Sequence, residues 1–70
     1  MYFRRIADLR HDNDKSQEDI AKSLNCSRQV YGRYERGDRE IPISLLIKLA
    51  DYYNVSIDYI VGASNNKQRR

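Results

Sequence analysis

Stop and start signals for α-helices follow one another so closely in this sequence that only short helices fit between them. Asn25-Cys26-Ser27 and Asn54-Val55-Ser56 each place an asparagine, one apolar residue and a serine in succession. Asparagine tolerates the left-handed conformation that ends a helix, and a serine side chain caps the first turn of the next helix. The chain is therefore expected to turn sharply between helices at both places.

Apolar residues recur at helical spacing between these signals. Phe3, Ile6 and Leu9 show this spacing near the N-terminus, and Gly37 and Gly62 are helix stops later in the chain. No segment has the alternating pattern of a strand. The sequence therefore predicts an all-α fold of five short helices, over about residues 2–12, 16–24, 27–36, 43–53 and 56–61.

The second of these helices carries the most complete start signal. Ser16 is suited to cap it, and Asp19, three residues later, can face back toward the amides of the first turn. We expect this helix to begin at a well-defined residue.

Length and composition exclude several classes of small protein. Seventy residues allow one domain with a small apolar core. The single cysteine, Cys26, and the single histidine, His11, exclude an internal disulfide and a zinc finger. No run approaches the roughly 18 apolar residues of a membrane span. A free cysteine without an export signal predicts a cytoplasmic protein.

The excess positive charge of the chain lies at its C-terminal end. The net charge is +3, yet residues 1–62 carry ten basic and ten acidic residues, and the excess comes from Lys67, Arg69 and Arg70. We expect one folded domain over residues 1–62 and a disordered basic tail over residues 63–70. Because the domain itself is balanced, any evidence for nucleic acid must come from how its charges are arranged.

The charges of the third predicted helix are gathered on one face. A turn of about three residues, Asn25-Cys26-Ser27, joins it to the second helix, as in a helix-turn-helix. Tyr31 and Tyr34 lie on one side, and the opposite arc of roughly 140° holds Arg28, Gln29, Gly32, Arg33 and Arg36. Arginine and glutamine make paired hydrogen bonds to guanine and adenine edges. A solvated basic face is the alternative, but the capped partner helix and the tight turn favour DNA.

The chain resembles the phage repressor and Cro-like helix-turn-helix family (the XRE family) in three segments: Ser16-Gln17-Glu18-Asp19-Ile20-Ala21, Ser27-Arg28-Gln29-Val30-Tyr31 and Tyr34-Glu35-Arg36-Gly37. Residues 41–43 and 49–59 are similar to the fourth and fifth helices of that family, so the resemblance covers about residues 2–62. It implies a lambda-repressor-like DNA-binding domain. It also implies a transcriptional regulator, usually a repressor, that binds double-stranded DNA as a homodimer on a palindromic operator.

The resemblance also implies a role for individual residues. Those at base-reading positions are Arg28, Gln29 and Arg33, with Val30 able to touch a thymine methyl group. Those at positions that approach the DNA backbone are Gln17, Ser27, Arg36 and Arg39. Arg10 and Glu35 match an internal ion pair that ties the first helix to the third. Gly32 stands where the family usually has a longer polar side chain, so no side-chain contact is expected there, and the sequence does not explain it.

Other classes of function fit the sequence less well. A protein-interaction module of the same fold, such as an antitoxin or an anti-repressor, would carry acidic or apolar residues on the outward arc of the third helix. A protein that binds single-stranded RNA would need exposed aromatic rings for stacking. No arrangement of catalytic residues is visible, so we expect no enzyme. We likewise expect no cofactor, metal, small-molecule substrate or membrane partner.

Overall fold

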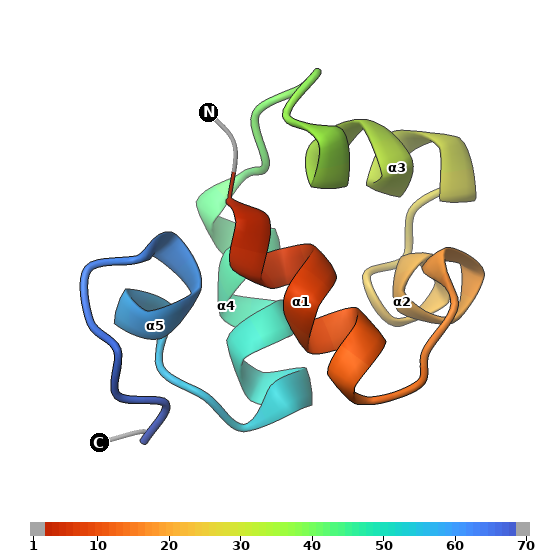
Figure 1. The fold of residues 1–70 in the computed structure, drawn as a ribbon. Helices are drawn as coiled ribbons and strands as arrows, with labels where there is room; N and C mark the ends of the chain where they lie inside the picture. The colour runs from red at the N-terminus through yellow and green to blue at the C-terminus, as the bar shows by residue number, and fades with distance from the viewer. Residues whose placement is uncertain (1–2, 69–70) are drawn as a thin grey trace.

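A computed structural model describes residues 3–68, and within that range the chain forms five α-helices and no strand. The helices are α1 (Arg4–Asp12), α2 (Gln17–Ser23), α3 (Arg28–Arg36), α4 (Ile43–Tyr53) and α5 (Ile57–Val61). This confirms the predicted all-α class. Figure 1 shows α1 and α4 in the middle of the molecule, with α2 and α3 on one side and α5 on the other. The predicted helix start at residue 2 lies outside the described residues.

Serine caps decide where three of the helices begin. Ser16 Oγ accepts a hydrogen bond from the Asp19 amide at 3.0 Å, and the Asp19 carboxylate accepts one from the Ser16 amide at 3.0 Å. Ser27 and Ser56 each accept the amide three residues further on. Each bond satisfies a donor that has no partner inside its own helix. The starts of α2, α3 and α5 are therefore held by side chains, as the sequence predicts.

Left-handed residues end the helices at the predicted positions. Asn25 follows α2 with a φ of 58°, and Asn54 follows α4 with a φ of 55°. Gly37 after α3 and Gly62 after α5 have φ values of 80° and 84°. Asparagine and glycine are the residues that adopt this conformation at least cost. The short connections between helices follow from these stops.

Every helix contributes to one apolar core. α1 contacts both α3 and α5, while α2 packs against α3 and α4 against α5. The buried apolar side chains are Ile6, Leu9, Ile20, Ala21, Leu24, Tyr31, Tyr34, Ile41, Leu46, Leu49, Ala50, Val55 and Ile60. Tyr31 is the largest of the fully buried side chains, so α3 is anchored to the core by an aromatic ring.

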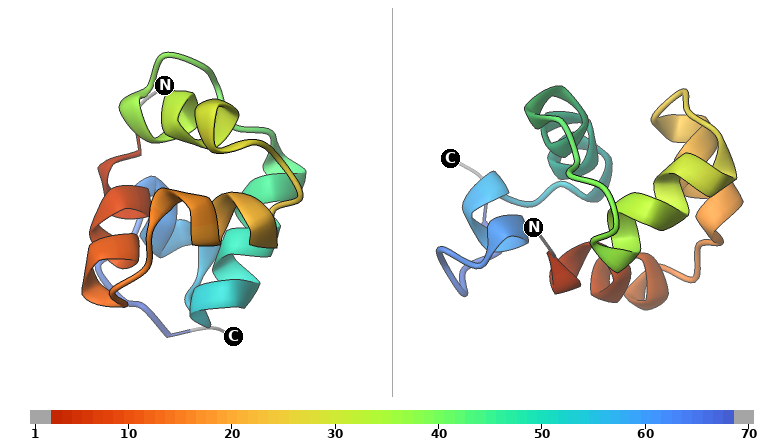
Figure 2. Two further views of the ribbon diagram at one scale, coloured as in Figure 1. Left: turned by 90° about the vertical axis from the view of Figure 1, so that its right-hand side faces the viewer. Right: turned by 90° about the horizontal axis from the view of Figure 1, so that it is seen from above.

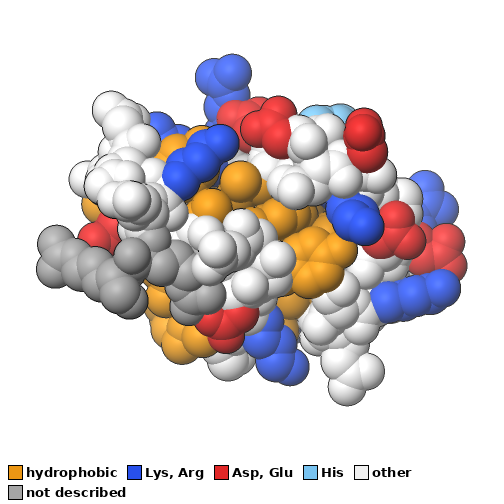
Figure 3. Space-filling model, turned by 90° about the horizontal axis from the view of Figure 1, so that it is seen from below, with side chains coloured by type: hydrophobic (Ala, Val, Ile, Leu, Met, Phe, Trp, Pro, Cys, Tyr) orange, Lys and Arg blue, Asp and Glu red, His pale blue; other side chains and the backbone are white. Residues whose placement is uncertain are grey.

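Some apolar surface is left outside this core. Ile43 and Ile47, one turn apart on α4, are 69% and 45% exposed. On the face of the molecule opposite α3, apolar side chains reach the surface with charged side chains around them (Figure 3). No helix among residues 3–68 is long and apolar enough to cross a membrane.

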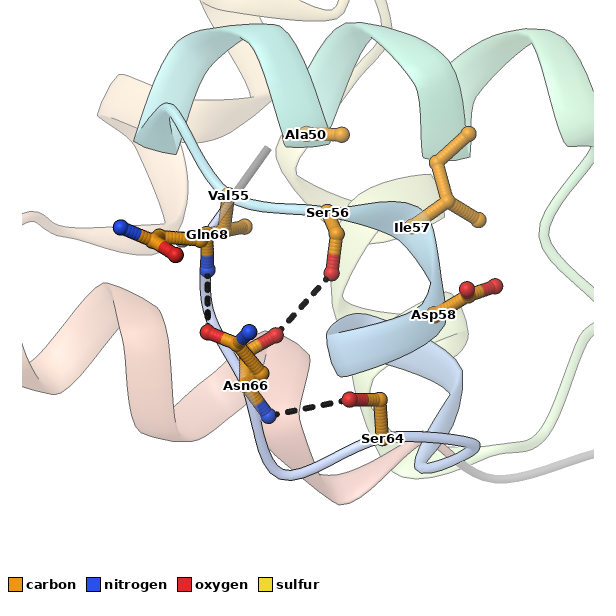
Figure 4. A pocket seen from close by; sticks show the side chains of 8 residues that line it. All are labelled: Ala50, Val55, Ser56, Ile57, Asp58, Ser64, Asn66 and Gln68. Carbon is orange, nitrogen blue, oxygen red and sulfur yellow. Dashed lines mark hydrogen bonds between the residues drawn. The ribbon is translucent and has the colours of Figure 1, made fainter. Parts of the chain in front are cut away.

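Residues 63–68 follow α5 without regular secondary structure and turn back beside it. The Ser56 amide donates to the Lys67 carbonyl at 3.0 Å. Ser56 Oγ donates to the Asn66 carbonyl at 3.2 Å, as Figure 4 shows. Arg5 donates from Nη1 to the Ser64 carbonyl and from Nη2 to Asn65 Oδ1, both at 2.6 Å. A hollow of about 300 Å³ lies between this segment and the start of α5.

These contacts involve part of the segment for which composition predicts a disordered tail. Composition reports how much apolar area a segment can bury, and it carries no information about hydrogen bonds to a distant arginine. Arg5 also donates to the Tyr59 carbonyl at 2.8 Å, and its guanidinium lies 4.2 Å from the centre of the Tyr59 ring. The last two residues of the predicted tail, Arg69 and Arg70, lie outside the described residues.

Candidate nucleic-acid interface

α2 and α3 form a tight pair on one side of the molecule, with α3 above α2 in the left view of Figure 2. In the turn between them, the Cys26 amide donates to the Ala21 carbonyl at 3.0 Å. Ala21 is 2% exposed, so its small side chain lets the helices pack closely. This is the geometry of a helix-turn-helix, and it leaves the outer face of α3 open.

The two faces of α3 differ in the way that the sequence predicts. Tyr31 and Tyr34 are buried against the core. The exposed residues of the helix are Arg28, Gln29, Arg33 and Arg36. Among residues 3–68, Arg28 and Arg33 form no ion pair, whereas Arg36 Nε lies 3.0 Å from Asp38 Oδ2 on the surface. The outer face therefore presents uncompensated positive charge.

A hollow of about 330 Å³ lies where α2 meets this outer face, and we call it the α2–α3 hollow. It is lined by Gln17, Arg28, Gln29, Gly32, Arg33 and Arg36. Five of these six are residues to which the resemblance gives DNA contacts. The sixth, Gly32, has no such role in the sequence analysis, because a glycine gives no local signal beyond its poor helix propensity.

Three other residues with an implied DNA contact do not line the hollow. Ser27 lies at the start of α3, where its Oγ accepts from the Val30 amide at 3.1 Å. Val30 is half-buried and packs against the core. Arg39 is exposed in the loop that follows α3. These residues flank the hollow along the chain and are not part of its wall.

A buried ion pair lies on the inner side of α3. Arg10 Nε donates to Glu35 Oε2 at 2.9 Å, and Arg10 Nη2 donates to Glu35 Oε1 at 2.8 Å. The two side chains are only 12% and 8% exposed. Gln17 Nε2 also donates to Glu35 Oε1, at 3.3 Å. The sequence did not predict this third member of the cluster. The single acid of α3 is therefore buried and paired with Arg10, and it does not compensate the exposed arginines of the outer face.

The protonation state of this pair follows from its contacts. Burial opposes ionisation of Glu35, but the hydrogen bonds and positive charge of Arg10, together with the neighbouring Tyr31 and Gln17 side chains, outweigh it and lower the pKa of Glu35 below its ordinary value of 4.5. The hydrogen bond to Glu35 raises the pKa of Arg10 further. Both groups are charged at neutral pH, so the pair as a whole carries no net charge.

The chemistry available in the α2–α3 hollow is that of a hydrogen-bond donor site for anions and base edges. Guanidinium groups bind phosphate and guanine, and side-chain amides bind adenine. No group of three or more His, Cys, Asp or Glu side chains that could hold a metal ion occurs in the part of the chain that the structure describes.

Comparison with known proteins places this geometry in a family. The family model described as "Helix-turn-helix" matches residues 6–60. The chain is 33% identical over 66 residues, 94% of its length, to the helix-turn-helix-type transcriptional regulator YobD of Bacillus subtilis. It is 33% identical over 64 residues, 91% of its length, to the transcriptional repressor RstR of the cryptic phage CTXphi of Vibrio cholerae.

A third relative is the helix-turn-helix-type transcriptional regulator ImmR of Bacillus subtilis, 34% identical over 59 residues, which is 84% of the chain. The chain spans 59%, 58% and 46% of the lengths of YobD, RstR and ImmR, respectively. The match covers α2, α3 and the hollow between them. The chain therefore belongs to the phage repressor and Cro-like helix-turn-helix family.

Proposed function

We propose that this protein is a sequence-specific transcriptional regulator, and most simply a repressor, that reads the major groove of double-stranded DNA with α3. One observation carries the proposal: arginine and glutamine side chains from two capped helices converge on one exposed hollow. A helix-turn-helix presents the same face of its second helix to the groove. The names of the relatives, which include a transcriptional repressor, support the same reading.

The base-reading residues in this proposal are Arg28, Gln29 and Arg33. Arg28 and Gln29 belong to the first turn of α3, which enters the groove deepest in this motif. Gln29 should prefer adenine, and an arginine that reaches a base edge should prefer guanine. Val30, half-buried against the core, adds at most a contact with a thymine methyl group.

The residues that hold the DNA backbone in this proposal are Gln17, Ser27, Arg36 and Arg39. Contacts with phosphates fix the register of the protein without reading sequence. Ser27 Oγ accepts a hydrogen bond as the cap of α3, and its own proton remains available to a phosphate oxygen. Arg36 approaches the backbone from the edge of the α2–α3 hollow.

We further propose that two copies bind a palindromic operator. One helix-turn-helix makes few contacts, so useful affinity is expected from two half-sites about one helical turn, roughly 34 Å, apart. Ile43 and Ile47 give a second copy an apolar surface on α4, outside the α2–α3 hollow. The proposal places the protein in the cytoplasm and includes no catalytic step, cofactor or small-molecule substrate.

Selection from a random duplex library, followed by mobility shifts at two salt concentrations, tests this function. We expect an enriched motif with two-fold symmetry, and an affinity that falls steeply with salt as the arginines release counterions. A lone half-site should bind more weakly than the palindrome. Absence of enrichment together with salt-independent binding would instead favour the protein-interaction module, an antitoxin or anti-repressor of the same fold.

A further inference from the structure

Gly32 is the residue of α3 that neither helix propensity nor backbone conformation explains. A glycine inside a helix destabilises it relative to alanine. Among residues 3–68, the glycines with positive φ are Gly37 and Gly62, so Gly32 has an ordinary helical backbone that any residue could adopt. Gly32 is nevertheless buried, at the floor of the α2–α3 hollow. The reason for a glycine must lie in the space that a side chain would fill.

That space lies between two of the residues proposed to hold the DNA backbone. A Cβ atom at position 32 would be 3.4 Å from Arg36 Nη1 and 3.6 Å from Gln17 Oε1. A methyl group would thus already touch both neighbours, and any larger side chain would fill the gap between them. We call this gap, floored by Gly32 and flanked by Gln17 and Arg36, the Gly32 notch.

The charges around the notch favour an anion as its occupant. Three guanidinium groups line the hollow, those of Arg28, Arg33 and Arg36. The nearby carboxylate of Glu35 is buried, and the two hydrogen bonds from Arg10 neutralise its charge. Gln17 gives one amide N–H to Glu35, which leaves its second N–H for another acceptor. A phosphate group is a compact anion with several acceptor oxygens, whereas a base edge is flat and uncharged.

We infer that Gly32 is a positioning residue for DNA binding, whose missing side chain lets one phosphate group of the DNA backbone sit in the notch between Gln17 and Arg36, against α3. This inference rests on the proposed function. Arg36 donates to the phosphate, and the remaining N–H of Gln17 is the second donor once the Gln17 amide turns its Nε2, in place of Oε1, toward the notch. Because α3 approaches the backbone without an intervening side chain, Arg28 and Gln29 reach further into the groove.

Two substitutions at position 32 test the inference, because they separate folding from binding. Alanine and leucine are both better helix formers than glycine, so Gly32→Ala and Gly32→Leu should melt at or above the temperature of the parent, as followed by circular dichroism. DNA affinity should change in the opposite direction. For Gly32→Leu we expect a loss on the order of tenfold on every duplex, as for one charge-assisted hydrogen bond. Gly32→Ala should lose less.

The salt dependence of DNA affinity separates the two roles, because a substitution at Gly32 that affected only the fold would leave it unchanged. Loss of one phosphate contact should reduce the slope of log affinity against log salt by about one for Gly32→Leu. Ser23→Leu is the matched control, because it adds the same side chain at an exposed position of α2 outside the hollow. It should leave both the affinity and the slope at the parent values.

The possible outcomes distinguish this inference from the function on which it rests. A parent protein that binds no duplex would contradict the proposed function before any variant is compared. A parent that binds DNA while a folded Gly32→Leu binds equally well, with the same slope, would overturn the notch alone. A loss confined to one base pair would also overturn it, because the notch would then hold a base edge. If Gly32→Leu fails to fold, Gly32→Ala decides by the same two measurements.

Discussion

The inner and outer faces of α3 carry charged groups in opposite circumstances. On the inner side, the Glu35 carboxylate is 8% exposed and receives two hydrogen bonds from Arg10, whose side chain is 12% exposed. On the outer side, Arg28 and Arg33 are exposed and have no ion-pair partner among residues 3–68. The contrast shows that one short helix can use one set of charges to hold itself in the fold and leave another set free for a polyanion.

The largest effect should come from breaking the inner pair. Arg10→Met would leave the Glu35 carboxylate buried without its charged partner, which costs on the order of 3–5 kcal/mol of unfolding free energy. That loss is a large part of the stability of so small a domain. Thermal and urea unfolding of the variant measure it directly.

The exposed pair of α1 gives the matched control. Arg4 Nε lies 3.7 Å from Asp8 Oδ2, and the two side chains are 80% and 48% exposed. Arg4→Met makes the same replacement on the same helix, and it should change the unfolding free energy by less than about 1 kcal/mol. Equal losses for the two variants would mean that burial does not distinguish these charges.

Substitutions on the outer face of α3 should change which DNA sequences the protein prefers. Gln29→Ala should remove about 1–3 kcal/mol of discrimination at one base pair of each half-site and leave the other positions unchanged. Gln17→Ala should weaken binding similarly on every duplex, because phosphate contacts carry no sequence information. Competition with single-base operator variants measures both effects.

Gln17 also donates to Glu35, so the melting temperature of Gln17→Ala must be determined beside its affinity. If Gln29→Ala and Gln17→Ala gave the same uniform loss, α3 would not be the reading helix. The protein-interaction alternative would then be preferred.

A smaller effect should appear in the salt dependence of binding. Arg36→Gln removes a charge proposed to lie at the DNA backbone, so the slope of log affinity against log salt should fall by about one. Lys48→Gln, at an exposed position of α4 outside the α2–α3 hollow, is the control and should leave the slope unchanged. Two identical slopes would show that Arg36 does not contact DNA.

The smallest expected effect is the pH dependence of the stability that the Arg10–Glu35 pair contributes. The pKa of Glu35 is lower in the folded chain than its ordinary value of 4.5, so the pair stabilises the fold fully above that value. This contribution is lost as the pH falls through the lowered pKa. The stability gap between the parent and Arg10→Met should therefore narrow below about pH 4.5, as followed by urea unfolding at several pH values. If the difference in unfolding free energy between the parent and Arg10→Met did not change with pH, the ionised Glu35 carboxylate would not be the cause of that difference.

Local signals explain why so much of the fold is predictable here. Ser16 with Asp19, and the asparagines at positions 25 and 54, act within a few residues of their own position, and the structure places them as expected. Tyr31 and Tyr34 lie on the buried face because helical periodicity alone decides which residues share a face. These features need no knowledge of how the helices are arranged.

The remaining features depend on that arrangement. The contacts of Arg5 with Tyr59 and Ser64 join residues more than fifty positions apart, and no local pattern carries them. The Arg10–Glu35 pair is expected from family resemblance alone. Gly32 reads locally as an unfavourable helix residue, and its meaning emerges only when α2 brings Gln17 beside it.

The contacts of Arg5 have a consequence for the order of events during synthesis. Arg5 precedes α2 and α3 in the chain, whereas its partners, the carbonyls of Tyr59 and Ser64, follow them. The α2–α3 pair depends on neighbours close in sequence and can form while translation continues, because local contacts close short loops. On the ribosome, α2 and α3 can therefore pack together before α5 has been made and before α1 can be secured to it.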